Sequence, residues 1–301
     1  MVLSPFFVPA YAKINLTLEV LGKRHDGYHE LASIMQTVSL RDEILVSPDE
    51  SDSATCITDV PELNTPDNLA LRAAQLLLPL RLGAHDGAQI VLQKNVPVQA
   101  GLGGGSSDGA SVLLSLTRAW NLHLSAHQLL ELATKLGSDV PFFLTGGTAL
   151  VSGRGEHVRP LPDMRPFWVV IAKPDKALST AEVFRTLDPV EYTDGQVSDR
   201  FAAVISDERR APFELVHNSL ELAACKLVPE VSSLMLAMKR AGAQTVCMSG
   251  SGSAIFAPFE DIRNARATFS NIIAEGVNAW LARSVSRVEF MHMHAAMQEV
   301  S

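Results

Sequence analysis

Residues 97–108 read P-V-Q-A-G-L-G-G-G-S-S-D, with four glycines in the five positions that begin at Gly101. A run rich in apolar residues precedes this segment at 88–95, and a longer apolar run follows it to about Trp120. The pattern predicts a strand before the glycines and a helix after them, with the Ser-Ser-Asp sequence as capping residues. Glycines let backbone N–H groups converge on a phosphate, and a helix N-terminus adds unpaired donors. The segment therefore predicts a phosphate-binding loop, with a flexible turn as the alternative.

The residues alone do not decide which type of nucleotide-binding loop this segment forms. A P-loop requires Lys and then Ser or Thr after its last glycine, and Ser106 and Ser107 occupy those places. A dinucleotide-binding fingerprint that began at Gly101 would need Gly or Ala at position 106. Neither pattern fits this segment.

Toward the N-terminus, residues 12–20 read A-K-I-N-L-T-L-E-V and predict a strand. The alternation places the aliphatic residues on one face and Lys13 and Asn15 together on the other, so that both polar side chains can line one site. The alternative for Lys13, which the pattern alone favours, is a solvated strand residue. Residues 34–40 and 43–47 predict two further strands after a turn-rich insert at 22–27.

Strands and helices are mixed along the rest of the chain. Thr65 and Pro66 predict the start of a helix, as cap and first helical residue. The predicted helices include residues 68–78, 128–136 and 214–226. The predicted strands include 142–151, with an interruption at Gly146 and Gly147, and 286–292, and a polar surface excursion is predicted at 188–212. Because the order does not alternate strictly, an α+β class is favoured over a doubly wound sheet. A chain of 301 residues predicts two domains, which we place at residues 1–160 and 161–301.

The composition limits the class of protein. Apolar residues make up 47% of the chain and charged residues 19%, which excludes a disordered or collagen-like chain. The 25 Lys and Arg against 33 Asp and Glu leave a formal charge of −8, so composition does not support a nucleic-acid partner. Three cysteines, odd in number and far apart, fit neither a disulfide framework nor a zinc site and indicate a reducing compartment.

No segment predicts export or membrane insertion. The first residues lack the basic start, apolar core and cleavage site of a signal peptide. Residues 241–259 carry no charge, but their serines and glycines predict a loop between short strands instead of a membrane helix. We therefore expect a cytoplasmic protein without a membrane partner.

A second candidate site lies at residues 136–143, which read L-G-S-D-V-P-F-F. Asp139 follows a predicted helix end that Gly137 marks. A carboxylate held there can accept a hydroxyl proton or bind a metal ion. The alternative is a capping Asp before Pro141, which residue type alone favours.

Two histidine pairs have the spacing of metal ligands. His123 and His127 would share a helix face, and His292 and His294 would share a strand face. The first pair has no acidic residue between its members, and both pairs are interpreted as surface or core histidines. The protein ligand of any metal stays unknown at this point.

Five segments occur in an order that is similar to one known family. They are A-Y-A-K-I-N-L-T-L-E-V at 10–20, K-R-H-D-G-Y-H-E-L at 23–31, the glycine-rich segment at 97–108, L-G-S-D-V-P-F-F at 136–143 and M-S-G-S-G-S-A-I-F-A at 248–257. Together they closely resemble the GHMP small-molecule kinases. The segment at 23–31 most resembles the GHMP kinases of the bacterial and plastid isoprenoid pathway, which act on a cytidine diphosphate compound.

The resemblance implies a two-domain α+β GHMP kinase architecture with the active site in the cleft between the domains. It implies ATP-dependent phosphorylation of the 2-hydroxyl of 4-diphosphocytidyl-2-C-methyl-D-erythritol, giving the 2-phosphate and ADP in the non-mevalonate isoprenoid pathway. Asp139 is implied as the catalytic base with Lys13 beside it, and a nearby cation favours the ionised carboxylate. Mg²⁺ is expected to arrive with ATP, since it prefers phosphate and water oxygens.

The resemblance also implies binding residues. Those for ATP are Asn68, Lys94, Pro97, Gly101, Leu102, Gly103, Gly104, Gly105, Ser106 and Ser107. Those for the cytidine diphosphate substrate are Asn15, Tyr28, His29, Phe184, Ser249 and Gly250. Tyr28 and Phe184 are expected to stack on the two faces of the cytosine, and His29 to hydrogen bond to its edge.

Two alternatives stay open. Another GHMP kinase would act on homoserine, mevalonate or a sugar, and residues 26–29 argue against it. A nucleotide-binding regulatory module without catalysis is the other alternative, and the presence of both Lys13 and Asp139 argues against it. The sequence does not predict the oligomeric state.

Overall fold

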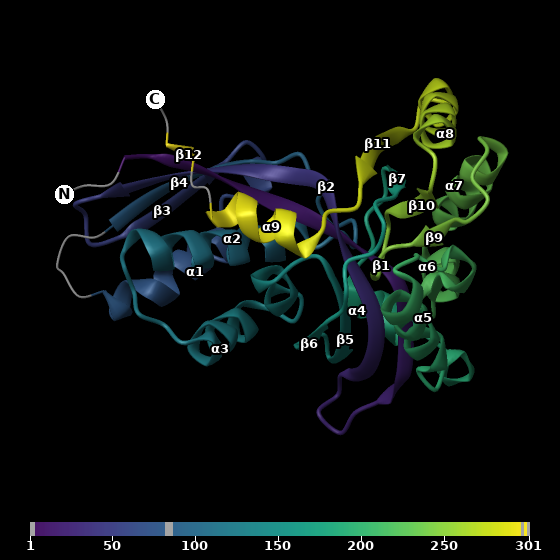
Figure 1. Ribbon diagram of the computed structural model, residues 1–301, viewed down its shortest axis with the longest axis horizontal. Coiled ribbons are helices and arrows are strands. Elements are labelled where there is room, and N and C mark those ends of the chain that lie inside the picture. The colour runs from purple at the N-terminus through teal and green to yellow at the C-terminus, as the bar shows by residue number, and fades with distance from the viewer. Residues whose placement is uncertain (1–3, 82–86, 296–297, 300–301) are drawn as a thin grey trace.

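Two sheets organise the chain (Figure 1). The computed structural model describes residues 4–81, 87–295 and 298–299. The first sheet has the strand order β12-β1-β2-β4-β3, with β5 joined to β2, β6 joined to β5 and β8 joined to β1. The second sheet has the order β11-β7-β10-β9. The strands are β1 Phe6–Lys23, β2 His29–Asp49, β3 Ala54–Thr58, β4 Gly87–Gln93, β5 Thr148–Gly153, β6 His157–Pro160, β7 Trp168–Lys173, β8 His217–Asn218, β9 Cys247–Met248, β10 Ile255–Phe259, β11 Asn278–Arg283 and β12 Gln298–Glu299. The α-helices are α1 Leu69–Leu77, α2 Gly104–Ala119, α3 Ala126–Leu136, α4 Thr180–Thr186, α5 Gln196–Glu208, α6 Glu221–Leu227, α7 Pro229–Arg240, α8 Ile262–Ala274 and α9 Arg287–Ala295.

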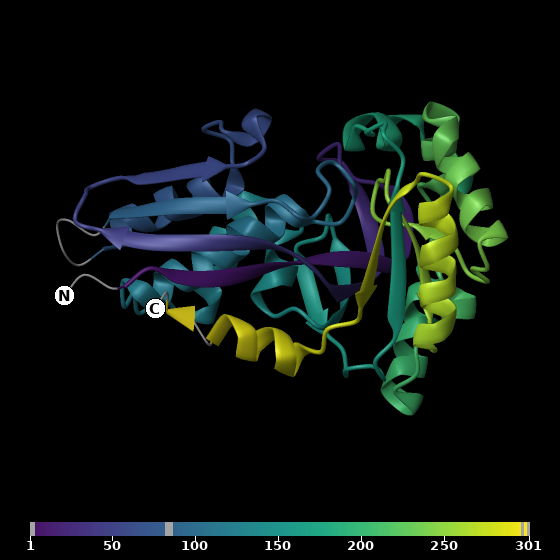
Figure 2. The same ribbon diagram turned by 90° about the horizontal axis from the view of Figure 1, so that it is seen from above.

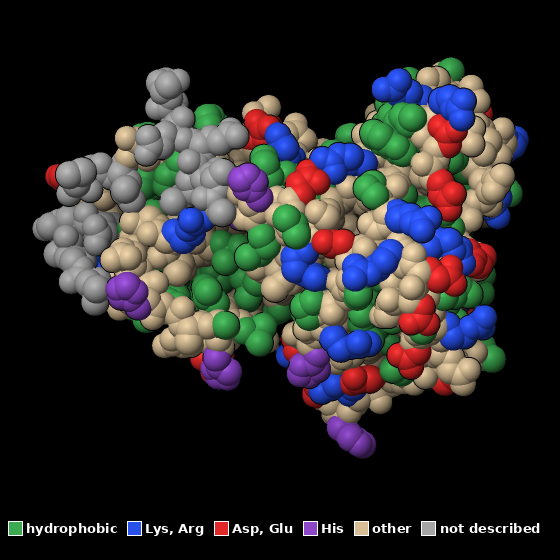
Figure 3. Space-filling model, in the orientation of Figure 1, with side chains coloured by type: hydrophobic (Ala, Val, Ile, Leu, Met, Phe, Trp, Pro, Cys, Tyr) green, Lys and Arg blue, Asp and Glu red, His purple; other side chains and the backbone are tan. Residues whose placement is uncertain are grey.

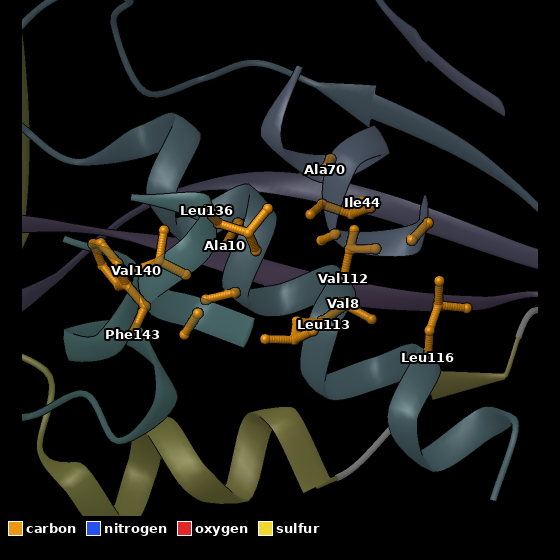
Figure 4. Close-up of a cluster of buried hydrophobic side chains, with 14 of the residues drawn as sticks. Val8, Ala10, Ile44, Ala70, Val112, Leu113, Leu116, Leu136, Val140 and Phe143 are labelled. Carbon is orange, nitrogen blue, oxygen red and sulfur yellow. The ribbon is translucent and has the colours of Figure 1, made fainter. Parts of the chain in front are cut away.

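Each sheet is covered by helices on one face (Figure 2). Helices α1 and α2 lie against the first sheet, where Val8, Ile44 and Leu113 belong to one buried apolar cluster (Figure 4). Helices α7 and α8 lie against the second sheet, where Val170, Leu234 and Ile272 belong to another. This mixed arrangement is the α+β class that the sequence predicts.

A third apolar cluster joins the two sheets. Ile14 of β1 and Ile171 of β7 are fully buried in it, together with Phe201 of α5. Ala100 and Leu102 of the glycine-rich segment are buried in the same cluster. The glycine-rich segment is therefore held where the two sheets meet.

Strand β2 is longer than the two strands expected at 34–40 and 43–47. It runs unbroken through Arg41 and Asp42, because β1 pairs with it along nearly its whole length. The pairing of β1 with β2 contains register shifts, one of them between Tyr11 and Lys13, and shifts of this kind let paired strands bend without separating. The expectation of two separate strands is wrong, since local polarity does not report pairing with a distant strand.

Three other local expectations are wrong. Helix α1 is capped by Asn68, whose side chain accepts a hydrogen bond from the Ala70 N–H, and not by Thr65. The expected strand at 142–151 is divided into the 3₁₀-helix Val140–Leu144 and β5, because Gly146 and Gly147 both have positive φ between them. The expected helix at 214–226 is confined to α6, since β8 pairs with β1 before it.

The region at 188–212 is not only a surface excursion. It contains α5, whose Phe201 and Ile205 are fully buried against the sheets. The polar residues that suggested an excursion lie on the other face of this amphipathic helix.

The predicted strand at 286–292 is the helix α9. Phe290 and His294 lie one turn apart and are buried on one face, whereas Val288 is 75% exposed. Phe290 packs on Tyr11 of β1 with ring centroids 5.9 Å apart, and His294 is therefore on a helix, not on a strand face. Packing against β1 favours the helical period over the alternating one.

The chain passes from β6 to β7 near the predicted domain boundary at residue 160, and that boundary stays a prediction. Helix α9, far along the chain, returns to the first sheet (Figure 1). On the face in Figure 3, charged side chains gather over the second sheet and its helices. Within the described residues, no helix is long and apolar enough to cross a membrane, and the first three residues of the N-terminal segment lie outside the described part.

Candidate active site

The glycine-rich loop is held by backbone hydrogen bonds from β1 and from the residue that precedes β10. The Lys13 N–H donates to the Leu102 carbonyl at 2.9 Å, and the Ala254 N–H donates to the Ala100 carbonyl at 3.0 Å. The Ser249 hydroxyl donates to the Gly101 carbonyl at 3.0 Å. The two glycine-rich segments of the sequence are thus directly bonded to each other.

Two positions in the loop require glycine. Gly101 has φ +74°, and a Cβ there would lie 2.1 Å from the Ser249 carbonyl oxygen. Gly103 has φ +71° and precedes the first residue of α2, so it is the helix cap in place of the expected Ser-Ser-Asp sequence. Gly105 differs, because a Cβ there would meet no atom within 4 Å. The loop therefore leaves the N-terminus of α2 open to a ligand.

Lys13 and Asp139 form the charged centre of the site. The Lys13 Nζ lies 3.4 Å from the Asp139 Oδ2, and it donates to the Asn15 Oδ1 at 2.6 Å. The Asn15 Nδ2 in turn donates to the Ser33 hydroxyl at 2.8 Å. The Lys13 side chain is 3% exposed, whereas Asp139 is 31% exposed. The buried partners fix the ammonium group, and the carboxylate stays accessible to a substrate.

The position of Asp139 follows from its local sequence. Helix α3 ends at Leu136, Gly137 follows as its cap, and Asp139 directly precedes the 3₁₀-helix Val140–Leu144. Its side chain makes no capping hydrogen bond to that helix. The capping alternative for Asp139 is therefore wrong, and the carboxylate pairs with Lys13.

Aromatic rings gather on the other side of the site. His29 stacks on Phe184 with ring centroids 5.0 Å apart and 26° between the planes, and Tyr192 meets His29 edge-on. Tyr28 is 55% exposed, and the Arg154 guanidinium lies 4.9 Å from its ring centroid. Burial, with the nearby Lys23 charge, lowers the pKa of His29, so its ring is neutral near pH 7.

One cavity of about 1350 Å³ connects the two sides. Single small-molecule pockets are about 300–1,000 Å³, so this cavity has room for two ligands. The predicted site residues that line it are Lys13, Asn15, Tyr28, His29, Gly101, Gly103, Ser106, Asp139, Phe184 and Gly250. Its ionised lining includes Lys13, Lys23, Arg154 and Arg185 against Asp139 and Glu182, so it attracts anions although the whole chain is acidic.

Other predicted residues lie outside this lining. They are Asn68, Lys94, Pro97, Leu102, Gly104, Gly105, Ser107 and Ser249. Asn68 caps α1, and Ser249 holds the Gly101 carbonyl. Lys94 is buried in an ion-pair cluster with Asp42 and Asp108. Their roles as ligands stay predictions.

The sequence did not predict some residues of the site. Arg154 lies in the turn between β5 and β6, and only the fold places it over Tyr28. Asn218 donates to the carbonyls of Met248 and Gly250 at 2.7 and 2.8 Å and so holds the second glycine-rich segment. No local pattern marks either residue, because their partners are distant in the sequence.

Within the described residues, no group of three or more His, Cys, Asp or Glu side chains could hold a metal ion.

Two domain descriptions match the chain. Residues 68–147 match the GHMP kinases N terminal domain, and residues 207–278 match the GHMP kinases C terminal domain. The first match contains the glycine-rich loop and Asp139, and the second contains the segment around Gly250. The fold and the site thus define a small-molecule kinase of the GHMP class.

Whole-chain comparisons narrow the class. A 4-diphosphocytidyl-2-C-methyl-D-erythritol kinase of Geobacillus sp. (strain WCH70) is 44% identical over 252 residues, which are 83% of this chain and 86% of that protein. A kinase of the same name from Syntrophotalea carbinolica is 39% identical over 287 residues, 95% of this chain and 99% of that protein. The chain belongs to the family of 4-diphosphocytidyl-2-C-methyl-D-erythritol kinases.

Solved structures agree with this assignment. The crystal structure of a 4-(cytidine 5'-diphospho)-2C-methyl-D-erythritol kinase is 36% identical with a TM-score of 0.80, covering 92% of this chain and 98% of that one. A homoserine kinase from Cytophaga hutchinsonii has a TM-score of 0.70 at 18% identity, covering 94% of this chain and 95% of that one. The second likeness concerns the fold alone.

Proposed function

We propose that this chain transfers the γ-phosphoryl group of ATP to the 2-hydroxyl of 4-diphosphocytidyl-2-C-methyl-D-erythritol. The bond between the substrate oxygen and the γ-phosphorus forms, the bond from that phosphorus to the β-phosphate oxygen breaks, and ADP leaves. The hydroxyl proton passes to Asp139. The observation that carries this proposal is one cavity that joins the Lys13–Asp139 pair to the His29–Phe184 ring stack.

The roles of the charged pair follow from its geometry. Asp139 is the accessible member and is suited to accept the hydroxyl proton. Lys13 is held by Asn15 and its Nζ lies 3.4 Å from the Asp139 carboxylate, so its charge can stabilise the oxygen as the proton leaves. A Cβ at Gly250 would lie 3.3 Å from the Lys13 Nζ, so glycine at position 250 leaves room for the ammonium group.

The glycine-rich loop supports binding of the ATP phosphates. Backbone N–H groups at the start of α2 and the positive end of the helix dipole favour anions there. Mg²⁺ supplies charge neutralisation on those phosphates when it is bound. Ser106 lines the cavity with a hydroxyl oxygen that Mg²⁺ accepts, and phosphates and water would complete its shell.

The ring side supports recognition of a cytosine. The edge of a cytosine presents a hydrogen-bond donor and acceptors. The neutral imidazole of His29 has one donor and one acceptor to match them. Tyr28 offers an exposed face for stacking. Arg154, next to Tyr28, adds a cation that can pair with the diphosphate of the substrate. The cytoplasmic location stays a prediction, and the oligomeric state stays unknown.

The other candidate substrates have weaker support. Homoserine, mevalonate and simple sugars have no aromatic base, so they would leave the exposed Tyr28 face and the neutral His29 edge unused. A regulatory module without catalysis would have no use for the accessible Asp139 carboxylate beside a buried ammonium.

A coupled assay of ADP release tests the proposal. The panel contains 4-diphosphocytidyl-2-C-methyl-D-erythritol, its uridine analogue, homoserine, mevalonate and galactose, each with ATP and Mg²⁺. We expect ADP release to depend on the cytidine compound, and phosphorus NMR to place the new phosphate on the 2-hydroxyl. Faster ADP release with another alcohol would identify that alcohol as the substrate instead. If the protein binds ATP but releases no ADP with any alcohol, the regulatory module would be favoured.

A further inference from the structure

A buried ion-pair cluster lies beneath the glycine-rich loop. The Lys94 Nζ donates to the Asp42 Oδ2 at 2.5 Å and to the Asp108 Oδ2 at 2.6 Å. The three side chains are 4%, 0% and 3% exposed in the order Lys94, Asp42, Asp108. None of them lines the cavity. The cluster is therefore close to the site but separated from its ligands.

The three residues come from the two ends of the loop and from a strand beside it. Lys94 directly follows β4, and Asp108 lies in the second turn of α2. Asp42 of β2 also accepts hydrogen bonds from the Asn95 and Val96 N–H groups, at 2.6 and 2.7 Å. One Lys side chain thus joins the point where the chain leaves β4 to the helix that the loop begins.

The charges of the cluster balance only if one carboxyl is protonated. Burial raises the pKa of Asp108 to about 8, the Lys94 charge opposes this rise, and the Asp42 charge adds to it. The pKa of Lys94 stays above its usual value despite burial, because Asp108 and Asp42 both favour its charged form. Near neutral pH, a protonated Asp108 leaves one ammonium paired with one carboxylate, which is the state that a buried site tolerates best.

The cluster also touches the start of α2. A Cβ at Gly104, the first residue of the helix, would lie 3.4 Å from the Lys94 Nζ and 3.0 Å from a Val96 methyl group. A shift of Lys94 would therefore move the helix start, where the phosphate-binding N–H groups are. The middle of the loop is held separately by Lys13, Ala254 and Ser249.

We propose that the Asp42–Lys94–Asp108 cluster closes the base of the glycine-rich loop and sets the geometry of its N–H groups for the phosphates of ATP. This inference rests on the proposed function for its ligand. The three residues act as positioning residues that do not touch the nucleotide. Lys94 then has a different role from the direct ATP contact that the sequence resemblance implies.

The test measures binding of a non-hydrolysable ATP analogue with Mg²⁺ by calorimetry on the whole chain. For Lys94→Met and Asp108→Ala we expect the dissociation constant to rise about tenfold or more, since losing one well-placed hydrogen bond to a charged phosphate costs about that factor in affinity. For Asp108→Asn we expect affinity close to the wild type, because the amide oxygen can still accept from Lys94. In steady state, the two disruptive variants should raise the KM for ATP and leave the KM for the cytidine substrate unchanged.

A matched control separates this role from general destabilisation. Gln36 of β2 is also buried and bonds to Thr148, Thr37 and Val285, but it is not bonded to the loop. Gln36→Leu should lower the melting temperature without changing affinity for the ATP analogue. If the single variants do not fold, Asp42→Asn/Lys94→Met/Asp108→Leu removes the buried charges together and still releases the loop.

The outcomes distinguish the possibilities. Wild-type affinity in folded Lys94→Met overturns the inference. Weak binding for Lys94→Met with normal binding for Asp108→Ala also overturns it, because Lys94 would then contact the nucleotide directly. Equal losses in Gln36→Leu would assign the effect to stability alone and overturn it as well. A wild-type protein that binds no ATP analogue would reject the proposed function itself.

Discussion

The two sides of the cavity are built in different ways. On the loop side, Ala100 and Leu102 are buried in the cluster between the sheets, and their carbonyls accept hydrogen bonds from Lys13 of β1 and from Ala254, which precedes β10. On the ring side, Tyr28 is exposed at a turn, and His29 lies at the end of the β1–β2 pairing, where its ring stacks on Phe184. Substitutions in the loop should therefore change stability and binding together, whereas substitutions among the rings should change selectivity and leave the fold intact.

The Lys13–Asp139 pair lies where the two sides meet, and its loss should have the largest effect. Asp139→Asn removes the base, so kcat should fall at least about a hundredfold while both substrates still bind. Lys13→Met should lower kcat similarly, with a smaller change in ATP affinity. Single-turnover kinetics and calorimetry measure both quantities.

Near-wild-type turnover in folded Asp139→Asn protein would contradict the base assignment. If Lys13→Met abolished ATP affinity but kept turnover at saturation, Lys13 would be a phosphate ligand instead.

The loop side can be tested with a pair of glycines. Gly101→Ala forces a side chain into a left-handed conformation and against the Ser249 carbonyl. The strained backbone alone costs about 1–3 kcal/mol, so both the melting temperature and ATP affinity should fall. Gly105→Ala is the control for the melting temperature, because its Cβ would meet no protein atom and alanine favours a helix. Equal melting temperatures for the two variants would show that the loop is not built into the core.

The ring side should respond in the opposite manner. Tyr28→Ala loses base stacking worth about 1–3 kcal/mol, or about ten- to a hundredfold in affinity for the cytidine substrate, with little change for ATP. His29→Ala should in addition reduce discrimination between the cytidine and uridine versions. The ratio of kcat/KM for the two versions measures this, well below each melting temperature. A ratio unchanged in both variants would reject base recognition by this pair.

The smallest expected effect is on stability against pH. His294 of α9 contacts the Ser111 hydroxyl of α2 at 3.1 Å and the Phe290 carbonyl at 3.0 Å. Burial lowers the pKa of His294 below its unfolded value of 6.5, so the unfolded chain binds the proton more readily. Stability from this group is present above the unfolded pKa and is lost as pH falls through it toward the folded pKa.

Thermal unfolding at about pH 7.5 and about pH 5.5 checks this expectation. His294→Gln should be less stable at the higher pH but should lose less on acidification than the wild type. His29→Ala is the comparison on the ring side, where burial is partial, and it should alter the pH dependence less. An identical slope in all three proteins would contradict the assignment.

The sequence by itself determined the features that depend on neighbouring residues. Glycines between an apolar strand and an apolar helix predict a phosphate-binding loop, and alternation in β1 places Lys13 and Asn15 on one face, where their side chains do bond. The loop and the alternation are local properties, because φ preference, helix capping and side-chain alternation act over a few residues. The kinase family and the Lys13–Asp139 pair came instead from the resemblance of the ordered segments to the GHMP kinases.

Only the tertiary structure decided which distant residues meet. The pairing of Asp42 with Lys94 depends on the register of β2 with β4, and the place of Arg154 over Tyr28 depends on how β5 joins β2. The same reason explains the error over α9, where packing on Tyr11 selected a helix from a sequence that alternates. Contacts of this kind are set by the free energy of burying surfaces from separate segments together, and no short window of sequence contains both partners.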